Sequence, residues 1–269
     1  MRDWAVDRGV IENEDLARRL RRAGIEGTRI PRAEAPPLDA GAGYAVQAAG
    51  RALCVAAGAR VAGRKVGLTS TGAQRAMGAS EPVSGYLLDS TVVTAGPEFD
   101  CAGLVAPRVE VEVAFVLARA LEGPDVSAAE VLAATAHLAP ALEIVDSRWE
   151  GGAPGVGALL ADNVSAAAVI VGGEVAPSVD LAGLRVTARI GETSAAGDAG
   201  NVLGDPARAV AWLCADLHRR GERLEAGDLI LSGALCGPAP VRPGEAVSAD
   251  FGGWGPLETR FTASPSGSG

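Results

Sequence analysis

The stretch PRVEVEVAFVL, residues 107–117, alternates between two kinds of side chain before it ends in an apolar run. Valines occupy every second position, and Glu110 and Glu112 lie between them. A period of two is typical of a β-strand with one buried face. The strand therefore leads into a core, and its second face carries two neighbouring glutamates that need an explanation.

A third glutamate interrupts another apolar run. Side chains two residues apart on a strand point the same way with Cα atoms about 6.5 Å apart, so two ionised carboxylates there repel each other. An exposed strand face is one explanation. The segment PALEIVDSR, residues 140–148, suggests another, because Glu143 lies between Leu142 and Ile144. Three converging glutamates would form an all-oxygen site that suits Mg²⁺ or Mn²⁺ better than zinc.

Two further segments place polar residues beside apolar runs. Lys65 in GRKVGLTS is either a surface lysine or a counter-charge for a carboxylate cluster and a donor to an anionic substrate. Asp162, Asn163 and Ser165 precede a predicted buried strand. They form either an ordinary turn or part of a pocket wall.

Composition excludes several classes of protein. The 269-residue chain has 24 basic and 33 acidic residues and a net charge of −9, which argues against nucleic acid as a partner. No apolar run reaches the roughly 20 residues of a membrane span, and the charged start predicts no signal peptide, so we expect a soluble cytoplasmic protein. The scattered cysteines and two histidines argue against a disulfide framework, a zinc site and a Ser-His-Asp hydrolase.

The pattern along the chain predicts an α+β fold with a β-rich core. Helices are predicted at residues 11–24, 44–57, 127–138 and 205–221, and short apolar runs between Gly and Pro indicate strands. We expect a helical N-terminal part, a β-rich catalytic core and a disordered tail, at residues 1–60, 61–262 and 263–269.

Taken together, the segments resemble one family, the 2-keto-4-pentenoate hydratases and 4-oxalocrotonate decarboxylases of the fumarylacetoacetate hydrolase superfamily. The motifs occur in the family's order between residues 40 and 262: GRKVGLTS, PRVEVEVAF, PALEIVDSR, LLADNVS, GDPARAVAWL and AGDLILSGAL.

The resemblance implies a mixed-sheet core, a homo-oligomer and a lyase. It implies that Mg²⁺ or Mn²⁺ is chelated by the carboxylate and 2-oxygen of a 2-hydroxy-dienoate or its 2-keto tautomer. It also implies that the reaction passes through an enolate. The residues that it implies are the metal ligands Glu110, Glu112 and Glu143, the catalytic residues Lys65 and Ser165, and the pocket residues Val83, Leu88 and Asp162.

One position departs from the hydratase pattern. Hydratases resemble QPDFG where this chain has EPVSG, so Val83 replaces an aspartate suited to acid–base work on water. Decarboxylases tend to have an apolar residue there, whereas the C-terminal motifs resemble the hydratases and Ser84 matches neither branch. We predict a hydratase first. The alternatives are a decarboxylase, another enolate reaction in a biosynthetic pathway, an acylpyruvate C–C hydrolase, and a non-catalytic partner subunit.

Overall fold

A computed structural model of the chain describes residues 3–263, with side chains from residue 12 onward. The helices in this range are α1 (Asp3–Glu26), α2 (Ala40–Ala56), α3 (Thr71–Met77), α4 (Ala128–Ala134), α5 (Val156–Ala161) and α6 (Pro206–Arg219). The longer strands are β1 (Val61–Gly67), β2 (Val83–Leu88), β5 (Arg108–Leu117), β6 (Thr135–Val145), β7 (Ala166–Val171), β8 (Arg185–Ile190), β9 (Thr193–Asp198), β10 (Leu229–Ala234), β12 (Ala246–Asp250) and β13 (Pro256–Thr262). The short strands are β3 (Val92–Thr94), β4 (Glu98–Asp100) and β11 (Ala239–Pro240).

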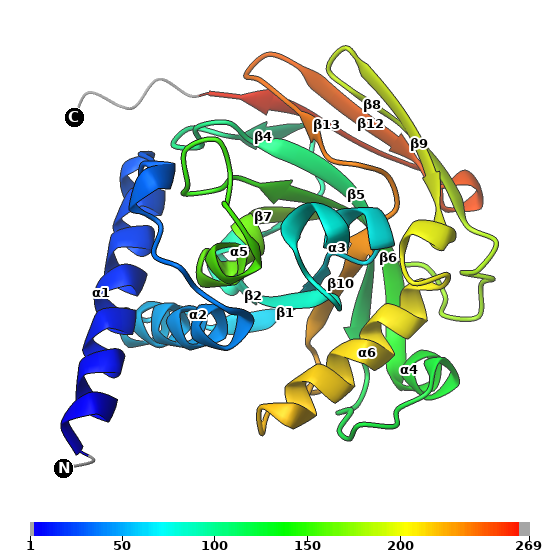
Figure 1. Ribbon diagram of the computed structural model, residues 1–269. Coiled ribbons are helices and arrows are strands. Elements are labelled where there is room, and N and C mark those ends of the chain that lie inside the picture. Colours follow the sequence, from blue (N-terminus) through cyan, green and yellow to red (C-terminus); the bar gives the residue numbers. More distant parts are fainter. Residues whose placement is uncertain (1–2, 264–269) are drawn as a thin grey trace.

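Two mixed sheets form the core. The larger sheet has the order β2-β1-β10-β5-β6-β7-β3, with β11 paired to the start of β5, and the smaller has the order β4-β13-β12-β8-β9. Figure 1 shows the smaller sheet at the upper right and helices α1 and α2 on the opposite side of the molecule. Valines and leucines from both sheets and from α6 share one hydrophobic core. The predicted α+β class with a β-rich, mixed-sheet core is confirmed.

The N-terminal helices are attached to the core through buried contacts. Trp149 is fully buried among α1, α2 and α5, and its indole N–H donates to Ala158 O at 3.0 Å. The Gln47 amide of α2 donates to Ser84 O on β2 at 2.9 Å and to Leu160 O on α5 at 3.1 Å. Because a buried amide must find partners, Gln47 fixes α2 against both elements.

Register between the central strands brings the glutamates together. In the antiparallel β5–β6 pair, Glu110 lies opposite Glu143. Cross-strand partners point to the same face, so the two carboxylates share one side of the sheet with Glu112. Val109, Val111 and Val113 of β5 lie on the other face and are fully buried. The alternation in this stretch therefore separates the core from the acidic face.

The prediction of a helix at residues 127–138 is correct only for its first half. Its capping box between Ser127 and Glu130 is present, but the helix ends at Ala134 and the next residue starts β6. His137 therefore lies on a strand, opposite Val116 of β5. Pro140 lacks a backbone N–H donor and disfavours a helix in the residues before it. The backbone groups of these residues form their hydrogen bonds with β5 instead.

Other differences concern short elements. The structure adds α3 and α5, which the sequence pattern did not predict. Helix α6 begins at Pro206, and the side chain of Asp205 caps it. Residues 264–269 of the predicted tail lie outside the described residues. Within residues 3–263, no helix combines the length and the apolar character that crossing a bilayer requires.

Candidate metal centre

Three glutamates form a compact cluster on the face of β5 and β6 opposite the hydrophobic core. Glu110, Glu112 and Glu143 each offer an oxygen within 4.8 Å of the others, and no other such group of potential ligands is found in the described part of the chain. Glu112 is 1% exposed and Glu143 is fully buried. We call these three residues and Lys65 the glutamate centre.

Burial raises the pKa of all three carboxyls. Desolvation is the largest cause for each, and it brings the pKa of Glu143 to about 7 against the opposing effect of Lys65. The pKa of Glu112 is raised well above its ordinary value by burial and then by repulsion from Glu143 and Glu110. The pKa of Glu110 is raised by burial and lowered in part by Lys65 and Arg108. Without a further cation, the cluster resists ionisation.

Lys65 of β1 is a buried counter-charge, the second of the two alternatives that its motif left open. It is 2% exposed, forms an ion pair with Glu143, and donates to Val164 O at 3.0 Å. Burial alone would lower the pKa of Lys65, but attraction by Glu143, Glu110 and Glu112 raises it, so the ammonium stays charged. Opposite Lys65 on β2 lies Gly85, where a Cβ would approach Lys65 Cγ to 3.0 Å. A glycine therefore makes room for the lysine side chain.

A left-handed turn provides the acceptor for Lys65. Asn163, Val164 and Ser165 have φ values of 49°, 52° and 58°, in the region that a β-branched residue rarely adopts. The Asn163 side chain accepts from Tyr86 N and donates to Tyr86 O, both at 2.9 Å. These two hydrogen bonds offset the strain and hold the turn against β2.

A bulge in β10 positions Glu112. The β10–β5 register shifts between Leu231 and Ala234, and Gly233 has a φ of 114°. Its N–H donates to Glu112 Oε2 at 2.7 Å. A Cβ at Gly233 would lie 2.5 Å from Thr69 Cγ2, so only glycine fits there. The bulge orients one glutamate and leaves its other oxygen for a ligand.

A cavity of about 770 Å³ opens above the centre. Lys65 and Glu110 lie at its floor, and Ser165 lies in its wall, so the cavity joins predicted residues from three segments. The apolar wall residues include Leu68, Ala73, Ala76, Met77, Ala153 and Leu159. The outer part carries Arg29 and Arg108.

The donor set fits a hard divalent cation. Both oxygens of Glu143 are buried, and within the described residues Lys65 is its only ion-pair partner. Three carboxylates against one ammonium leave an excess of two negative charges in the glutamate centre when all are ionised. A buried excess of this kind is costly, and a divalent cation with oxygen ligands neutralises it. The same donor set suits zinc poorly because it contains no sulfur or imidazole.

The three predicted pocket residues do not line this cavity. Val83 is 3% exposed and packs with Leu160 and Val164 beneath the left-handed turn. Leu88 ends β2 at the position opposite Val61, away from the cavity lining. Asp162 is buried and pairs with Arg148. The family resemblance implied that these three residues line the pocket, but none of them is among the residues that line this cavity.

Several residues in the site had no signal in the sequence interpretation. Arg29 comes from the segment after α1, and Arg108 is the first residue of β5. Gly233 acts through its backbone N–H, whose position depends on the register between β10 and β5. Arg108 could have been recognised, because it falls on the same period-two face as Glu110.

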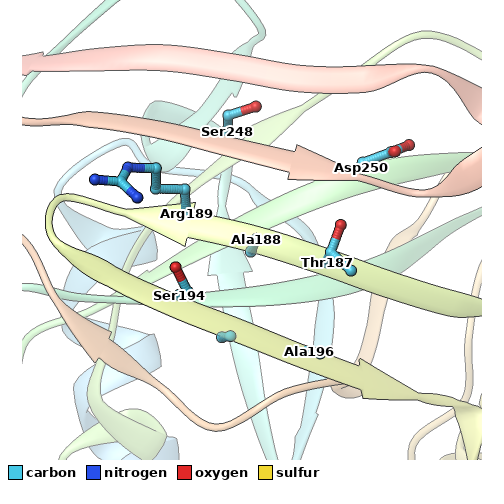
Figure 2. A pocket seen from close by; sticks show the side chains of 8 residues that line it. Thr187, Ala188, Arg189, Ser194, Ala196, Ser248 and Asp250 are labelled. Atoms are coloured by element: carbon cyan, nitrogen blue, oxygen red, sulfur yellow. The ribbon is translucent and has the colours of Figure 1, made fainter.

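A second hollow, of about 500 Å³, lies on the smaller sheet. Figure 2 shows short polar side chains on β8, β9 and β12 around it, with Arg189 and Asp250 at its sides. It contains no cluster of three potential ligands. The chemistry-bearing residues lie in the cavity above the glutamate centre.

The chain is similar to known proteins over most of its length. Residues 53–262 match the family described as fumarylacetoacetate (FAA) hydrolase C-terminal. The chain is 34% identical over 252 residues to a 4-oxalocrotonate decarboxylase from a Pseudomonas species, covering 91% of this chain and 95% of the relative. It is 35% identical over 252 residues to a 2-keto-4-pentenoate hydratase of Burkholderia vietnamiensis, covering 92% and 96%.

A solved structure shows the same fold over almost the whole chain. The 4-oxalocrotonate decarboxylase from Pseudomonas putida G7, complexed with magnesium and adipate, superposes with a TM-score of 0.87 at 32% identity. The superposition covers 93% of this chain and 97% of that one. With the family match and these two relatives, it shows that the chain belongs to the fumarylacetoacetate hydrolase family, among its hydratases and decarboxylases.

Proposed function

We propose that this protein is a divalent-cation-dependent lyase that acts on a 2-hydroxy-dienoate or its 2-keto tautomer, with water addition as its first reaction. The observation that carries the proposal is the glutamate centre, in which three carboxylates share one ammonium and Glu110 and Lys65 line an open cavity. Mg²⁺ or Mn²⁺ would be held by Glu110, Glu112 and Glu143. A bound cation of this kind supplies stabilisation of the negative charge that develops on substrate oxygens.

Lys65 holds a proton where the reaction needs one. Its ammonium has three protons, of which Val164 O accepts one and Glu143 pairs with another. The remaining proton is available to a substrate oxygen in the cavity that Lys65 lines. Lys65 therefore stabilises an anionic substrate or transfers a proton to it.

Ser165 orients the substrate from the other wall. Its hydroxyl lies 3.4 Å from Asp162 Oδ2, a long contact that leaves the hydroxyl available to a substrate oxygen. The left-handed turn that contains it also holds the acceptor of Lys65. Both groups are thereby fixed relative to each other, which favours a single substrate orientation.

The second candidate reaction is loss of CO₂, and the cavity lining favours it. Water addition needs a group that manages a proton, and no aspartate or histidine is found among the residues that line the cavity. Besides the two arginines, the ionisable lining residues are Lys65, Glu110 and Cys236. Hydration would rely on Lys65, whereas decarboxylation requires no base for water.

Product analysis distinguishes the two reactions. The Mg²⁺-loaded protein is offered 2-hydroxypenta-2,4-dienoate and 4-oxalocrotonate separately, and the products are identified by mass. Gain of water on the first compound supports the hydratase, and loss of CO₂ from the second supports the decarboxylase. Absence of both reactions in a protein that binds Mg²⁺ would contradict the proposed substrates. Glu112→Gln is the control for cation-independent turnover.

Assembly and location stay predictions. The expected homo-oligomer is tested by light scattering during size-exclusion chromatography of the purified chain. The expected cytoplasmic location is tested by fractionation of the producing cells.

A further inference from the structure

Ser84 of β2 is the centre of a buried polar cluster that lies outside the cavity. It is 1% exposed, does not line the cavity, and matches neither branch of the family at its position. Its hydroxyl donates to Asp216 Oδ2 at 2.8 Å, accepts from the Arg220 guanidinium at 2.7 Å and lies 3.3 Å from the Tyr44 hydroxyl. We call Tyr44, Ser84, Asp216 and Arg220 the Ser84 network.

The members of the Ser84 network satisfy one another. A serine hydroxyl has one donor and two acceptor sites, so the three contacts of Ser84 use all of them. Arg220 also forms an ion pair with Asp216 and lies 4.2 Å from the centre of the Tyr44 ring. Tyr44 belongs to α2, whereas Asp216 and Arg220 come from the end of α6. A satisfied buried network specifies one arrangement, so it fixes both helices against β2.

The backbone of Ser84 is held as well, at the free edge of the larger sheet. Strand β2 is terminal in that sheet, and within residues 3–263 it pairs with β1 alone. At its outer edge, Ser84 N donates to the Tyr44 hydroxyl at 3.0 Å and Ser84 O accepts from Gln47 at 2.9 Å. Two residues farther along, Tyr86 N and O bind the Asn163 side chain. Side chains thus replace a partner strand along this edge.

The same short stretch of β2 supports the left-handed turn. Val83 packs against Val164, and a Cβ at Gly85 would lie 3.0 Å from Lys65 Cγ. The turn provides Val164 O as the acceptor of Lys65 and places Ser165 in the cavity wall. Because these contacts are close-packed, a shift of β2 would move the turn and Lys65 with it.

We propose that Ser84 is a positioning residue: the Ser84 network holds β2, and β2 holds the turn that presents Lys65 and Ser165 to the substrate. The inference rests on the proposed function, in which these two residues act on the substrate. A displacement of about 1 Å can lower a reaction rate by as much as about 100-fold. The Ser84 network therefore sets the rate of the reaction and leaves the binding of the cation to the three glutamates.

Deletion of single hydroxyls tests the proposal. Ser84→Ala removes the centre of the network, and Tyr44→Phe removes the acceptor of Ser84 N while keeping the ring that Arg220 covers. In both Mg²⁺-loaded variants kcat should fall about tenfold, because Lys65 and Ser165 are displaced. KM and Mg²⁺ affinity should stay within about twofold, because the glutamates are not moved.

Thr135→Val is the matched control. The Thr135 hydroxyl is also buried and donates to Val131 O at 2.8 Å, but it lies at the opposite end of β6 from Glu143. This variant loses one buried hydrogen bond without altering β2 or the turn, and kcat should stay within about twofold. A fall in kcat as large as that of Ser84→Ala would show that kcat follows overall stability, and this would overturn the inference.

Hydrogen exchange of the metal-free protein gives a readout that does not depend on turnover. Ser84→Ala should speed the exchange of backbone amides in residues 83–88 and 163–166 about tenfold and leave residues 108–113 within about twofold. Unchanged exchange in the turn would overturn the inference, and so would a Mg²⁺ affinity that falls as much as kcat does. If the wild-type protein turns over neither proposed substrate, the proposed function fails, and the exchange rates still decide whether the Ser84 network holds the turn.

Discussion

Two acidic clusters lie close together in this protein, and they are built in opposite ways. In the glutamate centre, three carboxylates share one lysine. In the second, which we call the aspartate cluster (Asp146 and Asp162 with Arg29 and Arg148), every acid has a basic partner. Both clusters are nearly inaccessible to solvent, so burial alone does not distinguish them.

The aspartate cluster satisfies its acids with neighbouring groups. Asp146 accepts from Val105 N at 2.8 Å and Ala106 N at 3.1 Å, in addition to its ion pair. Asp162 pairs with Arg148, whose backbone N–H also donates to it at 3.0 Å. Burial raises the pKa of Asp162, and Arg148 opposes that rise. Acids that each have a basic partner serve the fold, whereas three glutamates that share one lysine leave coordination positions for a ligand.

The largest expected effect is loss of stability from the aspartate cluster. Asp162→Asn leaves Arg148, whose side chain is only 15% exposed, without its counter-charge and should lower the free energy of unfolding by about 3 kcal/mol. The isosteric change Glu143→Gln should not destabilise the metal-free protein, because it removes one charge from a centre with excess negative charge. Urea denaturation of both metal-free variants measures the difference. Equal destabilisation would remove the distinction between the clusters.

The next effect is loss of the cation. Glu112→Gln keeps an oxygen for Gly233 N–H but removes a negative ligand, so Mg²⁺ affinity and Mg²⁺-dependent turnover should fall about 100-fold or more. Calorimetry with Mg²⁺ and the product assay measure the two losses, and circular dichroism checks the fold. Full turnover in this variant would mean that the glutamates do not hold the cation.

A smaller effect concerns pH. A carboxyl whose pKa is higher in the folded state holds its proton more tightly there, and burial raises the pKa of Glu143 to about 7. Stability of the metal-free protein should therefore rise as pH falls through 7, by about 1–3 kcal/mol between roughly pH 8 and pH 6. Saturating Mg²⁺ should reduce this dependence, because the cation binds the ionised form. Denaturant titrations at both pH values, with Glu143→Gln as the control, measure it.

The smallest effect is predicted for the left-handed turn. Asn163→Asp keeps the acceptor for Tyr86 N but loses the donor to Tyr86 O, and should cost about 1 kcal/mol. Because the turn carries the acceptor of Lys65, turnover should fall by more than Mg²⁺ affinity does. Parallel measurements of unfolding, Mg²⁺ binding and turnover test this. Equal loss of binding and turnover would assign Asn163 to the glutamate centre instead.

Local periodicity explains what the sequence could predict. The β5 strand and its acidic face follow from the spacing of valines and glutamates, and the lysine and Glu143 stand out within apolar runs. The strand conformation of Thr135 and His137 could not be predicted in the same way, because their pairing with β5 competes with a helical pattern in the local sequence. Such pairing joins segments that the local sequence does not connect.

The direction in which side chains point was the other feature that the sequence could not predict. Val83 was expected in the pocket because of its position in a motif, yet it packs beneath the turn that carries Val164. The ion pair of Arg29 could not be predicted either, because its partner Asp146 is remote from it in the chain. A sequence shows that an arginine is present, but only the fold shows which acid occupies it.

Helix α3 gives the cavity a wall that can be redesigned separately from its floor. It is capped by Ser70, which accepts from Ala73 N, and ends at the left-handed Gly78, and none of its residues is buried. Three of its side chains face the cavity, whereas the floor belongs to central strands of the larger sheet. Libraries confined to Ala73, Ala76 and Met77 should therefore change which carbon chains are accepted while the chemistry below is preserved. This makes α3 the natural starting point for directed evolution of the protein towards new acids.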